Sequence, residues 1–309
     1  DMKTVVLSGG VGAARFLTGL VQVMDPRDIT VISNTGDDCE FYGLRVCPDI
    51  DTVIYSLAGM ANPQTGWGLM GDSFQALKEL KALGCETWFQ LGVRDLATHI
   101  WRTMMLRQGQ SLSQVTRTLA RLRGLELTIL PMSDQPVHTV LETEIGRLPF
   151  QEYMVKHRFQ LAVKHICFEG CDQALPAPGV LEAIADAKRI IIAPSNPYVS
   201  IGTILAVPGI RQALEQATGK VAAISPIVGG NAVKGPAARM LSDFGQPVSP
   251  LGVAQIYQSF LDLMIVDEKD QALLPEIRAM GIEAVSTQTM MTSLQAKITL
   301  AKQVLEFMQ

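Results

Sequence analysis

The sequence is poor in the residues and runs that mark several classes of protein. Its five cysteines, Cys39, Cys47, Cys85, Cys167 and Cys171, are odd in number and form no C-x-x-C pair. A disulfide framework or a structural zinc site needs paired cysteines at short spacing. We therefore interpret these residues as the reduced thiols of a cytoplasmic protein. No segment approaches the ~20 consecutive apolar residues that a membrane helix needs.

The net charge is small, and the common catalytic motifs are absent. The net charge of −4 provides no global positive field that would recruit nucleic acid. The Walker motif, the G-x-S-x-G nucleophile motif and a cysteine with a histidine signature are absent. Met2 is followed by one lysine and a short apolar run that ends in Gly-Gly, which does not resemble a secretory signal. We therefore expect a cytoplasmic protein that binds neither nucleic acid nor membrane.

Strand-length apolar runs alternate with helical patterns along the chain. The runs are residues 2–8, 29–33, 85–91, 125–130, 163–168, 189–193, 221–225 and 263–266. The helical patterns are clearest at residues 73–83, 95–108, 111–123, 178–187, 208–217, 235–244, 250–260 and 290–308. This alternation predicts an α/β fold: a Rossmann-like, mostly parallel sheet with helices on both faces.

One stretch departs from the alternation. Residues 137–143 and 148–155 flank a turn at 144–146 and predict an antiparallel hairpin. With the helical patterns before it, this hairpin makes residues 60–160 an excursion from the core. The sequence shows no linker, repeat or low-complexity tail, and 48% of its residues are hydrophobic, enough for one large core. We expect a single α/β domain over residues 1–309.

The strongest functional signal is a set of four carboxylates. Asp37 and Asp38 follow a strand-like run and a turn-favouring triplet, and Asp49 and Asp51 come eleven to fourteen residues later. A parallel strand that ends in an acidic turn places carboxylates at the edge of the sheet where α/β proteins bind ligands. Mg²⁺ prefers such oxygen ligands. The alternative is that Asp37 and Asp38 only cap the next helix, for which one acid would suffice. We favour binding of a metal or substrate.

A glycine-rich loop follows the first strand-like run. It contains Gly9, Gly10 and Gly12, and Arg15 lies on the first turn of the helical pattern behind it. This arrangement directs backbone N–H groups and the positive end of a helix dipole at an anion. Glycine-rich turns are common in α/β proteins, so the loop alone is a weak sign, but Arg15 adds a fixed cation.

Two later loops also follow strand-like runs, at residues 194–201 and 225–236. Their polar, proline and glycine positions are Ser195, Asn196, Pro197, Ser200, Gly229, Gly230 and Lys234. The first is either an anion- or base-recognition loop or a plain turn. Glycine loops with a cation on both sides of an acidic cluster suit a diphosphate-linked donor better than a monophosphate. Since no nucleophile motif is present, this favours direct displacement at phosphorus, in which catalysis is positioning and charge neutralisation.

A third polar group follows the run at residues 85–91. It comprises Arg94, Asp95 and His99, of which Asp95 and His99 have the i, i+4 spacing of one helix face. Arg94 could hold a phosphate, and His99 could contact a substrate hydroxyl. The alternative is that Asp95 caps the helix and His99 is an ordinary core or surface histidine.

Seven motifs together resemble the 2-phospho-L-lactate transferase family over Met2 to about Asp270. They are, in order, G-G-V-G-A-A-R, N-T-G-D-D, C-P-D-I-D-T, G-W-G, R-D-L-A-T-H, A-P-S-N-P-x-x-S-I-G and S-P-I-V-G-G-x-A-x-K-G-P. The resemblance implies a Mg²⁺-dependent, homodimeric enzyme of coenzyme F-420 biosynthesis. It implies transfer of a phospholactyl or phosphoenolpyruvyl group from a guanosine-diphosphate-linked donor to the ribityl hydroxyl of 7,8-didemethyl-8-hydroxy-5-deazariboflavin, with GMP as leaving group.

The resemblance also implies roles for individual residues. Catalytic roles fall on Asp37, Asp51, Arg94 and Asp95, with Mg²⁺ on Asp37 and Asp51 and with Asp38 and Asp49 nearby. The donor would be bound by Gly9, Gly10, Gly12, Arg15, Ser195, Asn196, Pro197, Ser200, Gly229, Gly230 and Lys234. The deazaflavin would lie across Asn34, Thr35, Trp67 and the stretch from Arg94 to His99.

Two positions depart from the family pattern. Ala13 stands where the family usually has glycine, which would crowd the loop, and Val93 stands where it usually has aspartate. Asp95 is retained, so we interpret the chain as an active enzyme. The alternative is a non-enzymatic nucleotide-sugar-binding regulator of the gluconeogenesis-factor type, although such proteins lack the C-P-D-I-D-T and G-W-G blocks. An NAD-dependent dehydrogenase is disfavoured because the full dinucleotide fingerprint is missing.

Overall fold

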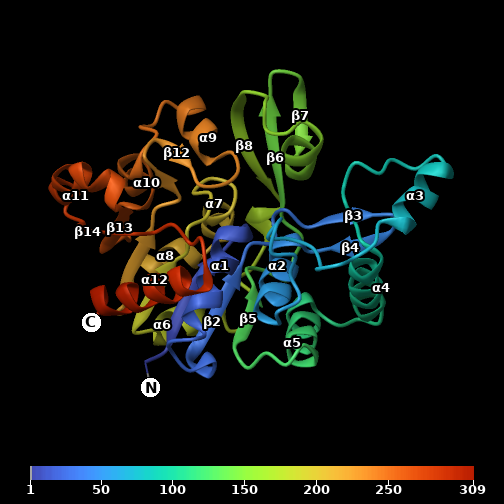
Figure 1. The fold of residues 1–309 in the computed structure, drawn as a ribbon, viewed down its shortest axis with the longest axis horizontal. Coiled ribbons are helices and arrows are strands. Elements are labelled where there is room, and N and C mark those ends of the chain that lie inside the picture. Colours follow the sequence, from blue (N-terminus) through green and yellow to red (C-terminus); the bar gives the residue numbers. More distant parts are fainter. Residues whose placement is uncertain (1) are drawn as a thin grey trace.

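The computed structural model describes residues 2–309 and is built around a seven-stranded parallel sheet (Figure 1). In spatial order its strands are β14 (Glu283–Thr287), β13 (Leu263–Asp267), β10 (Lys220–Ile224), β9 (Arg189–Ile192), β1 (Thr4–Ser8), β2 (Ile29–Ser33) and β5 (Thr128–Pro131). Each neighbouring pair is parallel. Most of these strands are buried on both faces, which explains why they read as continuous apolar runs.

Helices cover both faces of the sheet. One face carries α1 (Gly10–Leu20), α2 (Pro48–Leu57), α5 (Leu112–Leu122) and α12 (Leu294–Phe307). The other carries α6 (Val180–Asp186), α7 (Ile201–Ala206), α8 (Ile210–Glu215), α10 (Pro250–Tyr257) and α11 (Leu274–Ala279). Each face of the sheet packs against its helices in a separate hydrophobic core. In β1, Val6 packs in the core on the α1 side, and Val5 and Leu7 pack in the core on the α7 side, because successive strand side chains point to opposite faces. The predicted α/β architecture is confirmed.

The remaining elements lie outside the central sheet and the helices named above. Two-stranded sheets are formed by β3 (Cys39–Phe41) with β4 (Leu44–Val46) and by β11 (Ile227–Val228) with β12 (Asn231–Ala232). An antiparallel sheet of β7 (Gly146–Pro149), β6 (His138–Thr143) and β8 (Val163–Glu169) stands apart at the top of Figure 1. The remaining α-helices are α3 (Gln75–Ala82), α4 (Val93–Arg107) and α9 (Ala237–Asp243). Short helical turns are η1 (Pro26–Asp28), the π-helix η2 (Glu152–Lys156), η3 (Cys171–Gln173) and η4 (Glu268–Leu273).

The antiparallel sheet refines two predictions. The predicted hairpin is present as β6 and β7, but its second arm ends at Pro149, and η2 follows. Residues 163–168 form a strand as predicted, yet β8 pairs with β6 and not with the central sheet. Much of β8 is exposed or half-buried, unlike the central strands. The apolar run alone could not show whether this strand belongs to the central sheet or to the outer antiparallel sheet.

Two other predictions are wrong. Residues 85–91 form no strand; Phe89 stacks on Phe41 with ring centroids 4.5 Å apart, in a small separate apolar cluster beside β3 and β4. The excursion predicted over residues 60–160 is interrupted, because β5 returns to the edge of the central sheet. At the opposite edge, β14 was not predicted. Its sequence, EAVST, mixes polar and small residues because an edge strand is only partly buried.

The strand order determines where a ligand can bind. From β1 the chain extends to β2 and β5 on one side and, later, to β9, β10, β13 and β14 on the other. The loops after β1 and β9 therefore diverge at a topological switch point, where α/β sheets bind ligands. These loops touch: a Cβ atom at Gly12 would collide with the Pro194 carbonyl oxygen, and one at Gly9 with Ser200. The two glycines thus allow close packing of the loops.

Within residues 2–309, none of the helices combines the length and the apolar character required to cross a bilayer.

Candidate functional site

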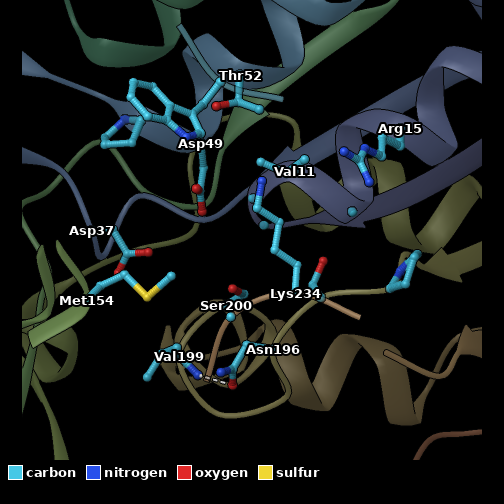
Figure 2. A pocket seen from close by; sticks show the side chains of 18 of the residues that line it. Val11, Arg15, Asp37, Asp49, Thr52, Met154, Asn196, Val199, Ser200 and Lys234 are labelled. Atoms are coloured by element: carbon cyan, nitrogen blue, oxygen red, sulfur yellow. Dashed lines mark hydrogen bonds between the residues drawn. The ribbon is translucent and has the colours of Figure 1, made fainter. Parts of the chain in front are cut away.

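A cavity of about 440 Å³ opens at the switch point, a size typical of small-molecule sites. Most of the predicted site residues line it. They are Gly9, Gly10, Gly12, Arg15, Asp37, Asp49, Asp51, Trp67, Asp95, His99, Ser195, Asn196, Ser200 and Lys234. Figure 2 shows Asp37 and Asp49 to the left of Lys234, and Arg15 to its right. The cavity therefore has an acidic and a basic side.

Asn34 organises the acidic side from behind the wall. Its side-chain amide donates to Asp37 Oδ2 at 3.1 Å and to Asp49 Oδ2 at 2.9 Å, and its side-chain oxygen accepts from the Gly36 N–H group. Burial, followed by the charges of Asp49 and Asp38, raises the pKa of Asp37 well above its ordinary value. Burial likewise raises the pKa of Asp49 to about 7. The acids are thus held together at an electrostatic cost that a cation would relieve.

Asp38 has a different environment from Asp37. It forms an ion pair with Arg45, 3.1 Å between Oδ2 and the Arg45 guanidinium, and it does not line the cavity. Thr35 is also buried without reaching the cavity, and its carbonyl oxygen accepts from the Asp38 N–H group. Neither acid caps a helix here: Asp37 and Asp38 form the turn before β3.

A second buried network joins α2 to α4. Asp51, on the first turn of α2, forms an ion pair with the guanidinium of Arg102 on α4. Arg102 also lies 3.2 Å from His99 Nδ1. His99 Nε2 is 3.2 Å from Asp95 Oδ1, which accepts a hydrogen bond from the Tyr55 hydroxyl at 2.7 Å. Because an arginine N–H group can only donate, His99 Nδ1 accepts and the proton of neutral His99 is on Nε2, facing Asp95.

The network has opposite effects on its two carboxylates. Burial raises the pKa of Asp51, and the charge and hydrogen bond of Arg102 offset only part of that increase. Burial also raises the pKa of Asp95, but the close contact with His99 and the hydrogen bond from Tyr55 outweigh it, so its pKa is below the ordinary value. The predicted i, i+4 pairing of Asp95 and His99 is confirmed, and Asp95 is held ionised.

The basic side is formed by α1 and the loop before α9. Gly9 is the N-cap of α1 and makes no side-chain cap, so the first N–H groups of this helix can face an anion. Lys234 donates from Nζ to the carbonyl oxygen of Thr65 at 2.6 Å. Burial and the charge of Arg15 lower the pKa of Lys234. The two cations therefore lie in each other's field, and an anion bound near both would be stabilised.

Besides Asn34, Thr35 and Asp38, four further predicted residues do not line the cavity. Arg94 is exposed and donates to the carbonyl oxygen of Met70 at 3.2 Å. With about 3.6 residues per turn, consecutive residues of α4 point in different directions, so Asp95 faces the cavity and Arg94 does not. Arg94 therefore lies outside the cavity wall, and its catalytic role stays a prediction. Pro197, Gly229 and Gly230 also lie outside the wall, and the Gly229 N–H group donates to Asp270.

The two departures from the family pattern lie away from the cavity as well. Ala13 is fully buried in the core under α1 and does not crowd the loop. Val93 is the first residue of α4, is 44% exposed and does not line the cavity. The change at residue 93 therefore removes no carboxylate from the cavity wall.

Part of the cavity wall was not predicted from the sequence. Among the missed residues are Thr52, Tyr55, Phe89, Gln90, Phe150, Met154, Thr289, Met290, Met291 and Thr292. Phe89 and Gln90 were assigned to a strand, and Thr289 follows a strand that was not predicted. Asp267, at the end of β13, accepts from the backbone and the hydroxyl of Thr289 at 2.9 and 3.1 Å and holds that segment. Asp267 directly follows a predicted strand, and an acid at that position was the one sequence signal that could have pointed to this part of the wall.

A model of the family described as 2-phospho-L-lactate transferase CofD matches residues 4–304 of the chain. The chain is 48% identical over 311 residues to a phosphoenolpyruvate transferase of Streptomyces griseus subsp. griseus, covering 99% of the chain and 98% of that protein. It is 38% identical over 302 residues to a 2-phospho-L-lactate transferase of Methanosarcina mazei, covering 98% of the chain and 99% of that protein.

Among solved structures, the chain is similar to a UPF0052 family protein of Bacillus halodurans. The TM-score is 0.65, with 99% of each chain covered and 16% sequence identity. This likeness shows a shared fold.

Proposed function

The chain belongs to the 2-phospho-L-lactate transferase family, and we propose that it moves a phosphoenolpyruvyl or phospholactyl group from a guanosine-diphosphate-linked donor to 7,8-didemethyl-8-hydroxy-5-deazariboflavin. The ribityl hydroxyl attacks the phosphorus that carries the three-carbon acid. A new O–P bond forms, the bond to the second phosphate breaks, GMP leaves, and the hydroxyl loses its proton. The observation that carries this proposal is one cavity with carboxylates opposite Arg15 and Lys234.

The relatives favour one donor over the other. Phosphoenolpyruvate transferases and 2-phospho-L-lactate transferases both match over nearly the whole chain. The sequence identity is 48% to the phosphoenolpyruvate transferase of Streptomyces griseus and 38% to the 2-phospho-L-lactate transferase of Methanosarcina mazei. We therefore infer that the enolpyruvyl donor is preferred.

Mg²⁺ is the metal that the family resemblance implies, and the carboxylates suit it. Asp37 Oδ1 and Asp51 Oδ2 are buried oxygens on residues of the cavity wall, and neither has a hydrogen-bond partner among residues 2–309. Hard oxygen ligands of this kind are those that Mg²⁺ prefers. We infer that Asp37 and Asp51 hold the ion, with Asp49 beside them. When bound, it would neutralise charge on the donor phosphates.

The chain's own groups would position both substrates. The N–H groups at the start of α1, with Arg15 and Lys234, would bind the diphosphate. Trp67 and Phe89 offer aromatic surface on the wall to a flat ring. Asp95 lines the wall, and its lowered pKa keeps it ionised but makes it a weak base. We infer that it accepts a hydrogen bond from the ribityl hydroxyl and orients it, and that the proton of the hydroxyl passes to water.

Release of GMP tests this function. Incubating the purified protein with Mg²⁺, the enolpyruvyl donor and the deazaflavin should release GMP only when the deazaflavin is present. Chromatographic quantification of GMP, with boiled protein as control, is the measurement. Tight nucleotide binding without any acceptor-dependent GMP release would favour the non-enzymatic regulator.

Replacing Val93 by aspartate should change kcat/KM by less than about threefold. The side chain is exposed and outside the cavity, and an acid on the first turn of a helix adds only about 0.3–1 kcal/mol of stability. Steady-state GMP release and Tm should be measured for both proteins. Restoration of activity to an inactive parent would show that Val93 is an inactivating residue and would contradict the placement of residue 93 outside the site.

A further inference from the structure

We propose that Arg102 is a positioning residue that fixes the Asp51 carboxylate so that its second oxygen stays free for the cation. This inference rests on the proposed Mg²⁺ site but concerns a residue that reaches the cavity only through Asp51, since Arg102 itself does not line the wall. Nothing in the sequence marks Arg102, because its partner lies 51 residues earlier in the chain.

The burial of Arg102 is the first observation. Its side chain is 1% exposed, and it is the largest fully buried side chain of the described residues. Removing a guanidinium from water is costly unless charge and hydrogen bonds compensate. Its compensating partners are Asp51, His99 Nδ1 at 3.2 Å and the carbonyl oxygen of Arg45 at 3.3 Å. These partners hold the guanidinium in one orientation.

The second observation is how the two oxygens of Asp51 differ. Oδ1 is paired with Arg102, while Oδ2 is buried without a hydrogen-bond partner in the described chain. Oδ2 lies 3.6 Å from His99 Nδ1, but that nitrogen already accepts from Arg102. The ion pair with Arg102 therefore fixes the rotation of the carboxylate and leaves one ligand atom free.

The contacts of Arg102 also argue against a metal ion bound among Asp51, Asp95 and His99. Asp51, Asp95 and His99 offer possible ligand atoms within 4.8 Å of one another. However, the guanidinium of Arg102 already contacts both Asp51 and His99, and a divalent cation among the three would face its charge. We infer that these side chains form a support held by Arg102, and that the cation binds on the cavity side of Asp51, toward Asp37.

Charge and positioning predict opposite results when Arg102 is changed. If Arg102 only neutralised Asp51, its removal would strengthen cation binding, because more negative charge would remain. If it positions Asp51, cation binding should weaken even when the positive charge is kept. Lysine keeps that charge but lacks the planar fork that binds a carboxylate, a histidine and a carbonyl together.

The test uses Arg102→Lys and Arg102→Met in the full chain, with Mn²⁺ as a probe that EPR detects without turnover. The Kd for Mn²⁺ should rise about tenfold in Arg102→Lys, the size expected when a residue that orients a metal ligand is changed. At saturating Mg²⁺, kcat should fall about tenfold, whereas the Kd for GMP should change less than twofold. Arg102→Met should also weaken Mn²⁺ binding.

Arg45→Met is the matched control. It removes the ion pair that half-buried Arg45 forms with buried Asp38, which lies outside the cavity. It should lower Tm but leave the Kd for Mn²⁺ within twofold of the parent. Unchanged or tighter Mn²⁺ binding in folded Arg102→Lys would overturn the proposal, as would equal weakening in Arg45→Met. If Arg102→Met does not fold, the Kd of Arg102→Lys for Mn²⁺ alone decides between positioning and charge. The Mn²⁺ measurement stands even if no transferase activity is found.

Discussion

Replacing Asp37 by asparagine should lower kcat/KM about a thousandfold while leaving the fold intact. Asp37 lies on the cavity wall with one buried oxygen that accepts no hydrogen bond from residues 2–309, and the proposed cation would contribute several kcal/mol of charge neutralisation. Asparagine keeps the size of the side chain but not its charge. The measurement is steady-state GMP release with both substrates, together with Mn²⁺ binding.

The stability of Asp37→Asn separates chemistry from folding. Burial and the charges of Asp49 and Asp38 raise the pKa of Asp37, so its charged form destabilises the folded protein at neutral pH. Removing that charge should leave Tm unchanged or raise it. Asp172→Asn, the same change at an exposed position on η3, is the control and should retain full activity. Near-normal activity of Asp37→Asn, or full activity of the parent in excess EDTA, would contradict the metal site.

Replacing Arg15 by alanine should weaken nucleotide binding about 10- to 100-fold. A hydrogen bond to a charged group contributes about 1.5–3 kcal/mol, and Arg15 follows the N-terminal turn of α1, where a phosphate is favoured. The Kd for GMP measured by calorimetry should rise accordingly. The Kd for the deazaflavin, measured by its fluorescence, should change less than twofold.

Arg15→Lys is the matched variant for that experiment. It retains the charge and loses the fork, so its affinity for GMP should lie between those of the parent and Arg15→Ala. Equal weakening of GMP and deazaflavin binding in Arg15→Ala, with a lower Tm, would instead assign Arg15 a role in folding.

The sequence predicted the central sheet well because parallel strands buried on both faces read as apolar runs. The same reasoning placed Asp37 and the glycine loop at one edge, since loops after parallel strands meet there. It failed for Phe89 because an apolar cluster outside the sheet has the same composition as a buried strand. It placed Arg94 at the site because the helix was expected to start at residue 95, whereas α4 starts at Val93.

Other parts of the site could not be read from a single chain. Arg102 lies in the middle of a helix with no motif around it, and only the packing of α4 against α2 reveals its partner Asp51. The segment from Thr289 to Thr292 reaches the cavity because Asp267 holds it after an edge strand. Both depend on contacts between segments distant in sequence, which local patterns do not record.

The mass of the product formed by the purified protein tests the central claim most directly. The protein should be incubated with Mg²⁺, the deazaflavin and equal amounts of the enolpyruvyl and lactyl donors, with Asp37→Asn in parallel. We expect a phosphodiester of the deazaflavin that carries mainly the enolpyruvyl group, with one GMP for each product molecule. Asp37→Asn should form this product about a thousandfold more slowly. Absence of any new deazaflavin species, from a folded protein that binds GMP and Mn²⁺, would contradict the account.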